Sequence, residues 1–133
     1  MYAERRRKLL EQIAGGLAIF CSPDESIRND DVHHDFRQDS DLFYLAGFEE
    51  PECVLVLAAK ANEKPVSVLF LRSKNQEREI WDGVRLGVEA APKSLGIDAA
   101  YPIEDLADKL HELMVGADHV YYDLGRHGRE QND

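Results

Sequence analysis

The chain has 133 residues, a length that suits one domain with a real hydrophobic core and leaves little room for a second. Hydrophobic residues make up 44% and charged residues 32%, which is the balance of a globular protein rather than of a disordered one. The formal net charge is -10, and an acidic surface repels phosphate backbones, so the composition argues against a nucleic-acid partner.

The sequence also lacks the signals of export and of membrane insertion. No apolar run approaches the roughly 20 residues that span a bilayer, and the charged N-terminus has no apolar core of a signal peptide. Cys21 and Cys53 each lie within an apolar stretch and are far apart, so both are predicted to be small core residues. We therefore expect a cytoplasmic protein with no membrane partner.

The first third of the chain predicts a helix, a strand and a long loop. Residues 2–14 have the spacing of an amphipathic helix that ends at Gly15 and Gly16. The basic run at 5–8 is interpreted as a solvated face of this helix. A short strand is expected over 17–21, followed by a polar loop over 22–35. The predicted buried stripe of the helix consists of Tyr2, Leu9, Leu10 and Ile13.

The middle of the chain predicts a short helix and a hairpin. Either Asp39 or Ser40 is placed to cap a helix over 41–46, and Gly47 is placed to end it in the left-handed conformation. Two strands are expected over 53–59 and 66–72, joined closely enough to pair antiparallel. The first strand is apolar throughout, which indicates a central position covered on both faces.

The last third predicts a polar connector over 73–79, a turn at Gly83 and Gly87, and a short helix near 88–95. A strand or extended piece over 97–101 leads to a helix over 104–115, opened by Pro102, and to a final strand over 119–122. The stripe of that helix consists of Leu106, Leu110, Leu113 and Met114. Together these elements predict an α/β domain whose mixed sheet has one antiparallel hairpin and otherwise crossover connections.

Three groups of residues have the side chains of a catalytic or binding site. The loop "DDVHHD" at 30–35 holds metal-binding side chains, but adjacent histidines do not easily face one ion, so exposed polarity is the favoured interpretation. The acidic residues around 39–52 offer paired carboxylates, yet a capped, ion-paired junction in which Arg37 binds a carboxylate is favoured over a catalytic dyad. The single tryptophan, Trp81, fits either the core or the rim of a binding cleft.

Three quoted stretches resemble the N-terminal domain of the aminopeptidase P family, a branch of the creatinase and prolidase metallopeptidases. They are "RNDDVHHDFRQDSDLFYLAGFEEPECVLVL" at 28–57, "VSVLFLR" at 66–72 and "EIWDGVRLGVEAAPKSLGID" at 79–98. The resemblance covers nearly the whole chain, and the first run is long and specific. His34-Asp35-Phe36 and Ala46 depart from the usual family pattern. The motif residues with structural roles are Arg37, Gln38, Asp39, Ser40, Asp41, Gly47, Gly83 and Gly87.

The resemblance implies a ribonuclease-H-like fold for residues 1–125 and a polar tail at 126–133 that leads toward a C-terminal metallopeptidase domain. In the family that domain holds two metal ions, usually manganese, and releases the residue that precedes proline. No family metal ligand and no catalytic residue matches a position in this chain, so the 133 residues alone are expected to be inactive. Trp81 and Asp31 are the positions that the resemblance places toward substrate.

The implied partners are the chain's own catalytic domain, proline-containing peptides and further copies of the same protein in a homo-oligomer. Within this interpretation the domain serves oligomerisation and shapes access of substrate to a cleft that lies elsewhere. Two alternatives stay open from the sequence. One is the related domain of a prolidase, which cleaves Xaa-Pro dipeptides, and the other is a stand-alone protein- or peptide-binding module without catalysis.

Overall fold

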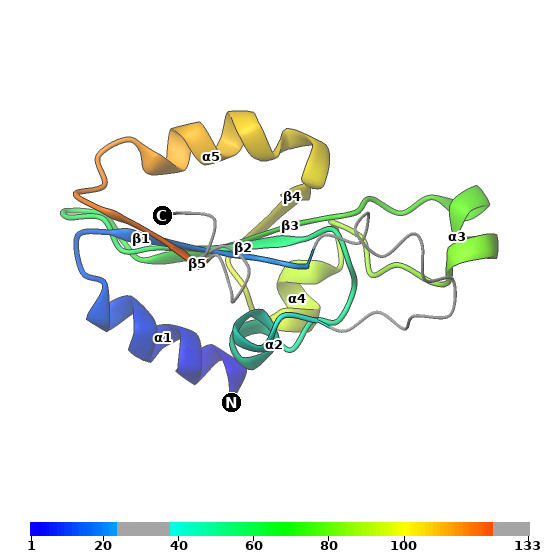
Figure 1. The fold of residues 1–133 in the computed structure, drawn as a ribbon, viewed down its shortest axis with the longest axis horizontal. Helices are drawn as coiled ribbons and strands as arrows, with labels where there is room; N and C mark the ends of the chain where they lie inside the picture. The colour runs from blue at the N-terminus through cyan, green and yellow to red at the C-terminus, as the bar shows by residue number, and fades with distance from the viewer. Residues whose placement is uncertain (24–37, 124–133) are drawn as a thin grey trace.

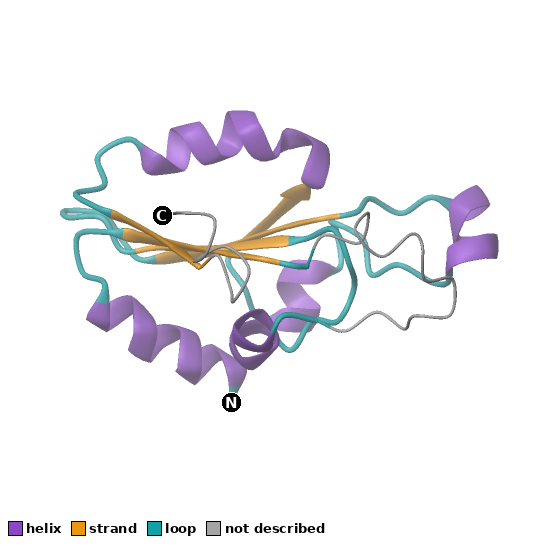
Figure 2. Ribbon diagram, in the orientation of Figure 1, coloured by secondary structure: helices purple, strands orange, loops and turns teal. Residues whose placement is uncertain are grey.

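The computed structural model describes residues 1–23 and 38–123, which form one mixed sheet between two layers of helices (Figures 1 and 2). The strands follow the order β4-β3-β2-β1-β5 across the sheet. The strands are β1 Leu17–Cys21, β2 Val54–Ala58, β3 Val66–Leu71, β4 Ala99–Pro102 and β5 Val120–Asp123. The helices are α1 Tyr2–Gln12, α2 Ser40–Ala46, α3 Gln76–Asp82, α4 Ala91–Leu95 and α5 Leu106–Met114, the last preceded by a 3-10 turn over Ile103–Asp105.

The pairing of the strands confirms the predicted hairpin and corrects one expectation. β2 and β3 pair antiparallel, with Val56 opposite Val68, and both β3–β4 and β1–β5 are parallel. β1 also pairs antiparallel with β2, whereas the sequence patterns predicted a single antiparallel hairpin. The direction of that pair depends on how the long connection between the two strands returns to the sheet, and strand patterns do not encode this.

The core is divided by the sheet into two apolar clusters. On one face α1, α2 and α4 cover side chains that include Leu55, Leu57 and Leu69, and on the other face α5 covers Val56 and Phe70 (Figure 1). Every residue of β2 is buried because successive side chains of a strand point to opposite faces, and both faces of the sheet are covered here. The central position that the apolar run predicted for β2 is confirmed.

α2 begins and ends as its sequence indicated. The side chain of Asp39 accepts a hydrogen bond from the backbone N–H of Leu42, so Asp39 is the cap and Ser40 is the first helical residue. Gly47 adopts the left-handed conformation at φ 67°, which glycine does without the steric cost that a Cβ would bring. Gln38 ties the start of α2 to the following loop by donating to the carbonyl oxygens of Phe48 and Glu50, each at 3.0 Å.

Arg6 corrects the interpretation of the basic run as a solvated face. Its side chain is only 2% exposed, while those of Arg7 and Lys8 are exposed. The Arg6 guanidinium donates to the carbonyl oxygen of Leu45 at 2.8 Å and to those of Leu95 and Gly96 at 3.0 Å. These carbonyls lie at the ends of α2 and α4, where helices leave acceptors unpaired, so Arg6 joins three helices on one face of the sheet.

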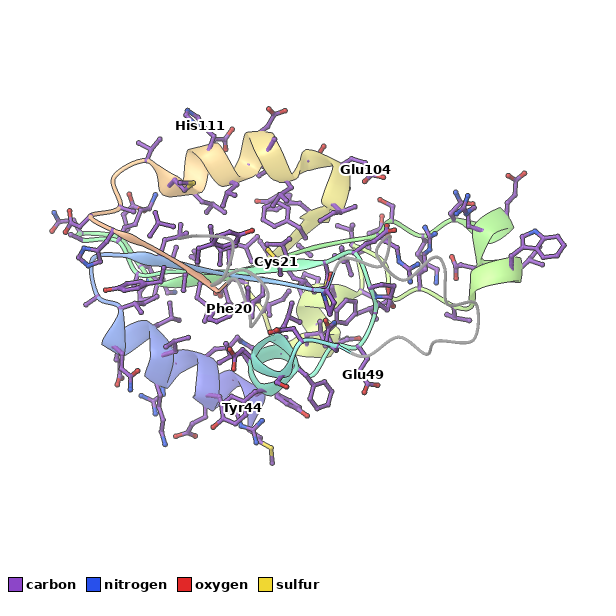
Figure 3. All side chains as sticks on the ribbon, in the orientation of Figure 1. Phe20, Cys21, Tyr44, Glu49, Glu104 and His111 are labelled. Atoms are coloured by element: carbon purple, nitrogen blue, oxygen red, sulfur yellow. The ribbon has the colours of Figure 1, made fainter. Side chains whose placement is uncertain are left out.

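Other expectations are corrected at single elements. The connector expected over 73–79 holds most of a helix, α3, and the helix expected near 88–95 is shorter as α4. Met114, expected in the buried stripe of α5, is 39% exposed, while the other members of that stripe are half-buried. Glu104 and His111, also from this layer, are exposed, and His111 lies on the side of α5 that faces away from the sheet (Figure 3).

Both cysteines are free thiols, and they differ in burial. Cys53 is a small core residue, as predicted, and burial raises its pKa from 9.0 to about 12. Cys21 is half-buried and packs against the edge of the core, with its thiol 3.7 Å from the hydroxyl of Tyr122, so the prediction of a core residue holds for it only in part. Across residues 1–23 and 38–123, no helix has the length and apolar character needed to cross a bilayer.

Candidate functional site

α3 stands apart from the layered body of the domain, at the end of two extended segments that leave the sheet (Figures 1 and 2). We call residues 73–87, which include these segments and α3, the arm. Gly83 ends α3 at φ 98° and Gly87 lies at the root of the arm at φ 87°. Both glycines of the predicted turn therefore adopt a backbone conformation that L side chains rarely adopt.

The tip of the arm is an apolar surface exposed to solvent. Trp81 is 85% exposed, and Ile80 and Val84 are 79% and 82% exposed. A tryptophan that packed in the core would be largely buried, so the structure excludes the core interpretation of Trp81. Three large apolar side chains gathered at one projecting tip form a surface suited to contact with a ligand or with another protein.

Hydrogen bonds within the arm hold α3 in place. The side chain of Asn75 accepts from the backbone N–H of Arg78 at 3.1 Å and caps the helix. Glu79 accepts from the backbone N–H of Asn75 at 2.9 Å and from that of Arg85 at 3.1 Å, one with each carboxylate oxygen. These two backbone donors hold the pKa of Glu79 below its usual value, because they stabilise the ionised carboxylate.

A second carboxylate fixes the root of the arm to the body. Glu50 accepts from the backbone N–H of Leu86 at 2.7 Å and pairs with the guanidinium of Arg72 at 3.5 Å. Arg85 donates to the carbonyl oxygen of Ser73 at 3.0 Å and so links the two segments of the arm. Glu50 therefore supports the interpretation of the acidic residues as an ion-paired junction, with Arg72 in the described structure as the cation.

Several predicted site residues lie outside the described ranges. These residues are Asp31, to which the resemblance assigned substrate contact, Arg37 of the structural motif, and His33 and His34 of the polar loop. Of the two positions expected to face substrate, only Trp81 is described, and the structure does not bring it into a cavity with acidic or histidine side chains. Its role in substrate binding stays a prediction.

A groove of about 460 Å³ lies between α1, α2 and β1, away from the arm. Phe20 and Tyr44, labelled in Figure 3, line it together with side chains of both charges. One wall is formed by Arg5, whose guanidinium lies 4.1 Å from the centre of the Tyr44 ring. The groove brings together no nucleophile with a base, and its charged residues lie on exposed helix faces.

The described residues do not fit a metal centre. Within 1–23 and 38–123, no three histidine, cysteine or acidic side chains are grouped closely enough to hold an ion. Glu50 and Glu79, the two carboxylates that hold the arm, are already engaged by backbone N–H groups and cations.

Sequence reasoning missed α3 and the two carboxylates that hold the arm. The helix has no apolar stripe, since its side chains do not pack on the sheet, and hydrophobic periodicity therefore does not indicate it. A weaker signal was present. Asn75 is a good cap, and the residues after it, Gln76 to Arg78, favour helix.

Comparison with known proteins gives the family. The sequence model of the aminopeptidase P N-terminal domain matches residues 2–121 of this chain. The chain belongs to the aminopeptidase P N-terminal domain family. This confirms the resemblance noted in the motifs of residues 28–98, and it agrees with the mixed sheet and its flanking helices.

Relatives in this family are much longer than the chain. An Xaa-Pro aminopeptidase of Escherichia coli is 41% identical over 128 residues, which cover 95% of this chain and 29% of that protein. The structure of aminopeptidase PepP from Pseudomonas aeruginosa is 43% identical in sequence and has a TM-score of 0.84. The match covers 98% of this chain and 30% of the Pseudomonas chain. The structure of zinc-substituted E. coli aminopeptidase P in complex with product has a TM-score of 0.85 at 40% identity. That match covers 94% of this chain and 29% of the E. coli chain.

Proposed function

We propose that this chain acts as the non-catalytic N-terminal domain of a metal-dependent Xaa-Pro aminopeptidase, an enzyme that releases the N-terminal residue ahead of proline. Family membership over nearly the whole chain supports the proposal, as do relatives named Xaa-Pro aminopeptidase. The proposed division is a domain over residues 1–125 with a polar segment at 126–133 that leads to the catalytic domain. The two divalent ions, manganese in our proposal, belong to that catalytic domain and supply an activated water there.

We assign the domain two tasks, which are oligomer assembly and the narrowing of access to a catalytic cleft. The observation that carries this assignment is the apolar tip of the arm, where Ile80, Trp81 and Val84 are each about four-fifths exposed. Surfaces of this kind mark contacts with other molecules, and tryptophan is a frequent anchor in such contacts. In the assembled enzyme we place Trp81 at the rim of a cleft occupied by a proline-containing peptide.

The first test measures the activity of the chain by itself. The purified 133-residue protein with Mn²⁺ is expected to release no N-terminal residue from an Xaa-Pro tripeptide, because its described residues contain no cluster of side chains that could hold a metal ion. Release of that residue above the blank rate would contradict the assignment of a non-catalytic role. The E. coli relative serves as the positive control under the same conditions.

The second test places this chain in an enzyme. A chimera that carries the proposed domain, residues 1–125 of this chain, in place of the matching part of the E. coli relative is expected to cleave Xaa-Pro tripeptides. Trp81→Ala in the chimera should raise KM about ten-fold with a smaller change in kcat, since an exposed aromatic anchor contributes on the order of 1–2 kcal/mol to a contact. Val115→Ala is the matched control, because Val115 is a 62% exposed apolar residue outside the arm.

The outcomes of the chimera separate the alternatives. Equal KM for the Trp81→Ala and Val115→Ala chimeras would remove the role of the arm in substrate access. Cleavage restricted to Xaa-Pro dipeptides would favour the prolidase alternative, for which no relative reported above gives support.

We also propose a cytoplasmic location, supported by two free thiols, which a fluorescent fusion in the native host would test.

A further inference from the structure

We propose that Glu79 is a positioning residue that holds the arm in shape, so that Trp81 is presented at a fixed place. The use that we assign to a fixed Trp81 rests on the proposed function. The clamp itself is a property of the 133-residue chain and has a test that does not require enzyme activity.

α3 is not expected to be stable through its own helical bonds. It has seven residues. Isolated helices shorter than about 12–15 residues are marginal in water, because forming the first turn fixes several backbone dihedral angles for a single hydrogen bond. Packing does not compensate for this cost. Of the α3 side chains that the structure describes, only Glu79 is not exposed, so the helix buries no apolar face against the body.

Glu79 supplies the missing connection. Its side chain is 12% exposed, and its two oxygens bind the N–H groups of Asn75 and Arg85, which stand on opposite sides of α3 along the chain. One carboxylate therefore joins the two ends of the segment 75–85, and a charged acceptor forms stronger hydrogen bonds than a neutral one. The amide of a glutamine has a single acceptor oxygen and cannot reproduce both bonds.

Glu79 also orients the cation that bridges the arm. The ammonium group of Lys74 lies 3.3 Å from Glu79 and donates to the carbonyl oxygen of Arg85 at 2.6 Å. The stem of Lys74 lies close to Gly87, where a Cβ would come within 2.5 Å of its Cγ atom. The lysine thus has room only because residue 87 is glycine, and its charge is held in place by Glu79.

The position of Trp81 at the tip of the arm depends on Glu79, because the two residues lie close together on α3. Trp81 is two residues from Glu79, and the exposed indole has little of its surface against the body of the domain. Its position is therefore set by the backbone of α3 and not by packing of the ring. Loss of the clamp is expected to leave the folded body intact while Trp81 moves over a wider range.

Trp81 is the only tryptophan of the chain and reports directly on the arm. We would measure its steady-state fluorescence anisotropy, together with amide hydrogen exchange of residues 75–86, in the wild type and in Glu79→Gln. The variant is expected to lose anisotropy at Trp81 and to lose exchange protection in the arm. Glu77→Gln is the matched control, since it removes the same charge from an exposed position on the same helix.

Far-UV circular dichroism and exchange in β2 verify that the body of each variant is folded. Unchanged anisotropy and arm protection in Glu79→Gln would overturn the proposal, and so would an equal loss in Glu77→Gln. If Glu79→Gln unfolds the whole domain, Glu79 is a stability residue and the proposal of a local clamp is wrong. A clamp that is confirmed here, with no effect of Glu79→Gln on KM in the chimera, would overturn only the proposed role in substrate access.

Discussion

The guanidinium of Arg6 shows how a single side chain can carry more structure than its sequence context indicates. It lies among apolar residues, and burial lowers its pKa while the carboxylate of Asp98 partly offsets that shift. The group keeps its charge, because an arginine does not lose its proton in proteins. Its donors reach three carbonyl oxygens at the ends of α2 and α4, of which that of Leu45 is in a buried bond and the other two are in partly buried ones.

Replacing Arg6 is therefore expected to destabilise the domain strongly. We predict that Arg6→Met lowers the free energy of unfolding by about 3 kcal/mol, since the substitution removes the donor to one buried and two partly buried carbonyl oxygens. Arg7→Met is the control and should cost less than about 1 kcal/mol, because Arg7 forms only exposed ion pairs with Glu4 and Glu11. Urea unfolding followed by circular dichroism measures both, and equal losses would contradict the role given to Arg6.

At the scale of the element, α2 and α3 have the same length but different sources of stability. α2 buries Leu42, Leu45 and Ala46 in the core. Its capping residues at the two ends determine where the helix begins and ends, while burial supplies its stability. α3 depends on polar contacts, and its carboxylate clamp is ionised in the folded arm. The clamp faces the ammonium group of Lys74 and the backbone N–H groups of Asn75 and Arg85, each of which favours the charged form.

The arm is accordingly expected to loosen in acid. The pKa of Glu79 is lower in the folded arm than in the unfolded chain, so its contribution is complete above the ordinary glutamate pKa and is lost as the pH falls through the lower value. Trp81 anisotropy should drop with a midpoint below about 4.3, the ordinary value for glutamate. Glu79→Gln should lack this transition and Glu77→Gln should keep it. A midpoint at or above the ordinary value would disagree with the clamp.

For the whole molecule, the order of the sheet sets the order of local stability. β2 lies at the centre, pairs with neighbours on both sides and is buried along its full length, while the arm has exposed backbone and few apolar contacts. β5 lies at one edge and carries Val120, Tyr121 and Tyr122, which are between 39% and 55% exposed. Regions with few buried contacts open at low free energy, and central strands open only with global unfolding.

Native-state hydrogen exchange should show this gradient. We expect the amides of Leu55 and Leu57 in β2 to exchange only through global unfolding, with a free energy equal to that from urea unfolding. The amides of α3 should exchange with a clearly smaller free energy, and those of the β5 edge with an intermediate one. Exchange of α3 at the rate of β2 would mean that the arm and the body form one cooperative unit.

Much of the fold was determined by local patterns in the sequence. The apolar run around Leu55 predicted a central strand, the Asp39 and Gly47 pair predicted the bounds of α2, and the spacing of the apolar strands predicted their hairpin. These patterns are sufficient because burial on both faces, capping and close connection depend on residues near one another in the chain. The family was likewise evident from the motifs at 28–98.

Tertiary structure decided the rest, because those features depend on residues far apart in the sequence. Arg6 reaches carbonyls 39 to 90 positions away, so its neighbours along the chain gave no sign of its burial. α3 has no apolar stripe and is held by bonds that close only once 75 and 85 come together, so periodicity missed it. The same hydrogen bonds place Trp81 at an exposed tip and not in the core. An exposed aromatic ring at such a tip is suited to contact with another molecule.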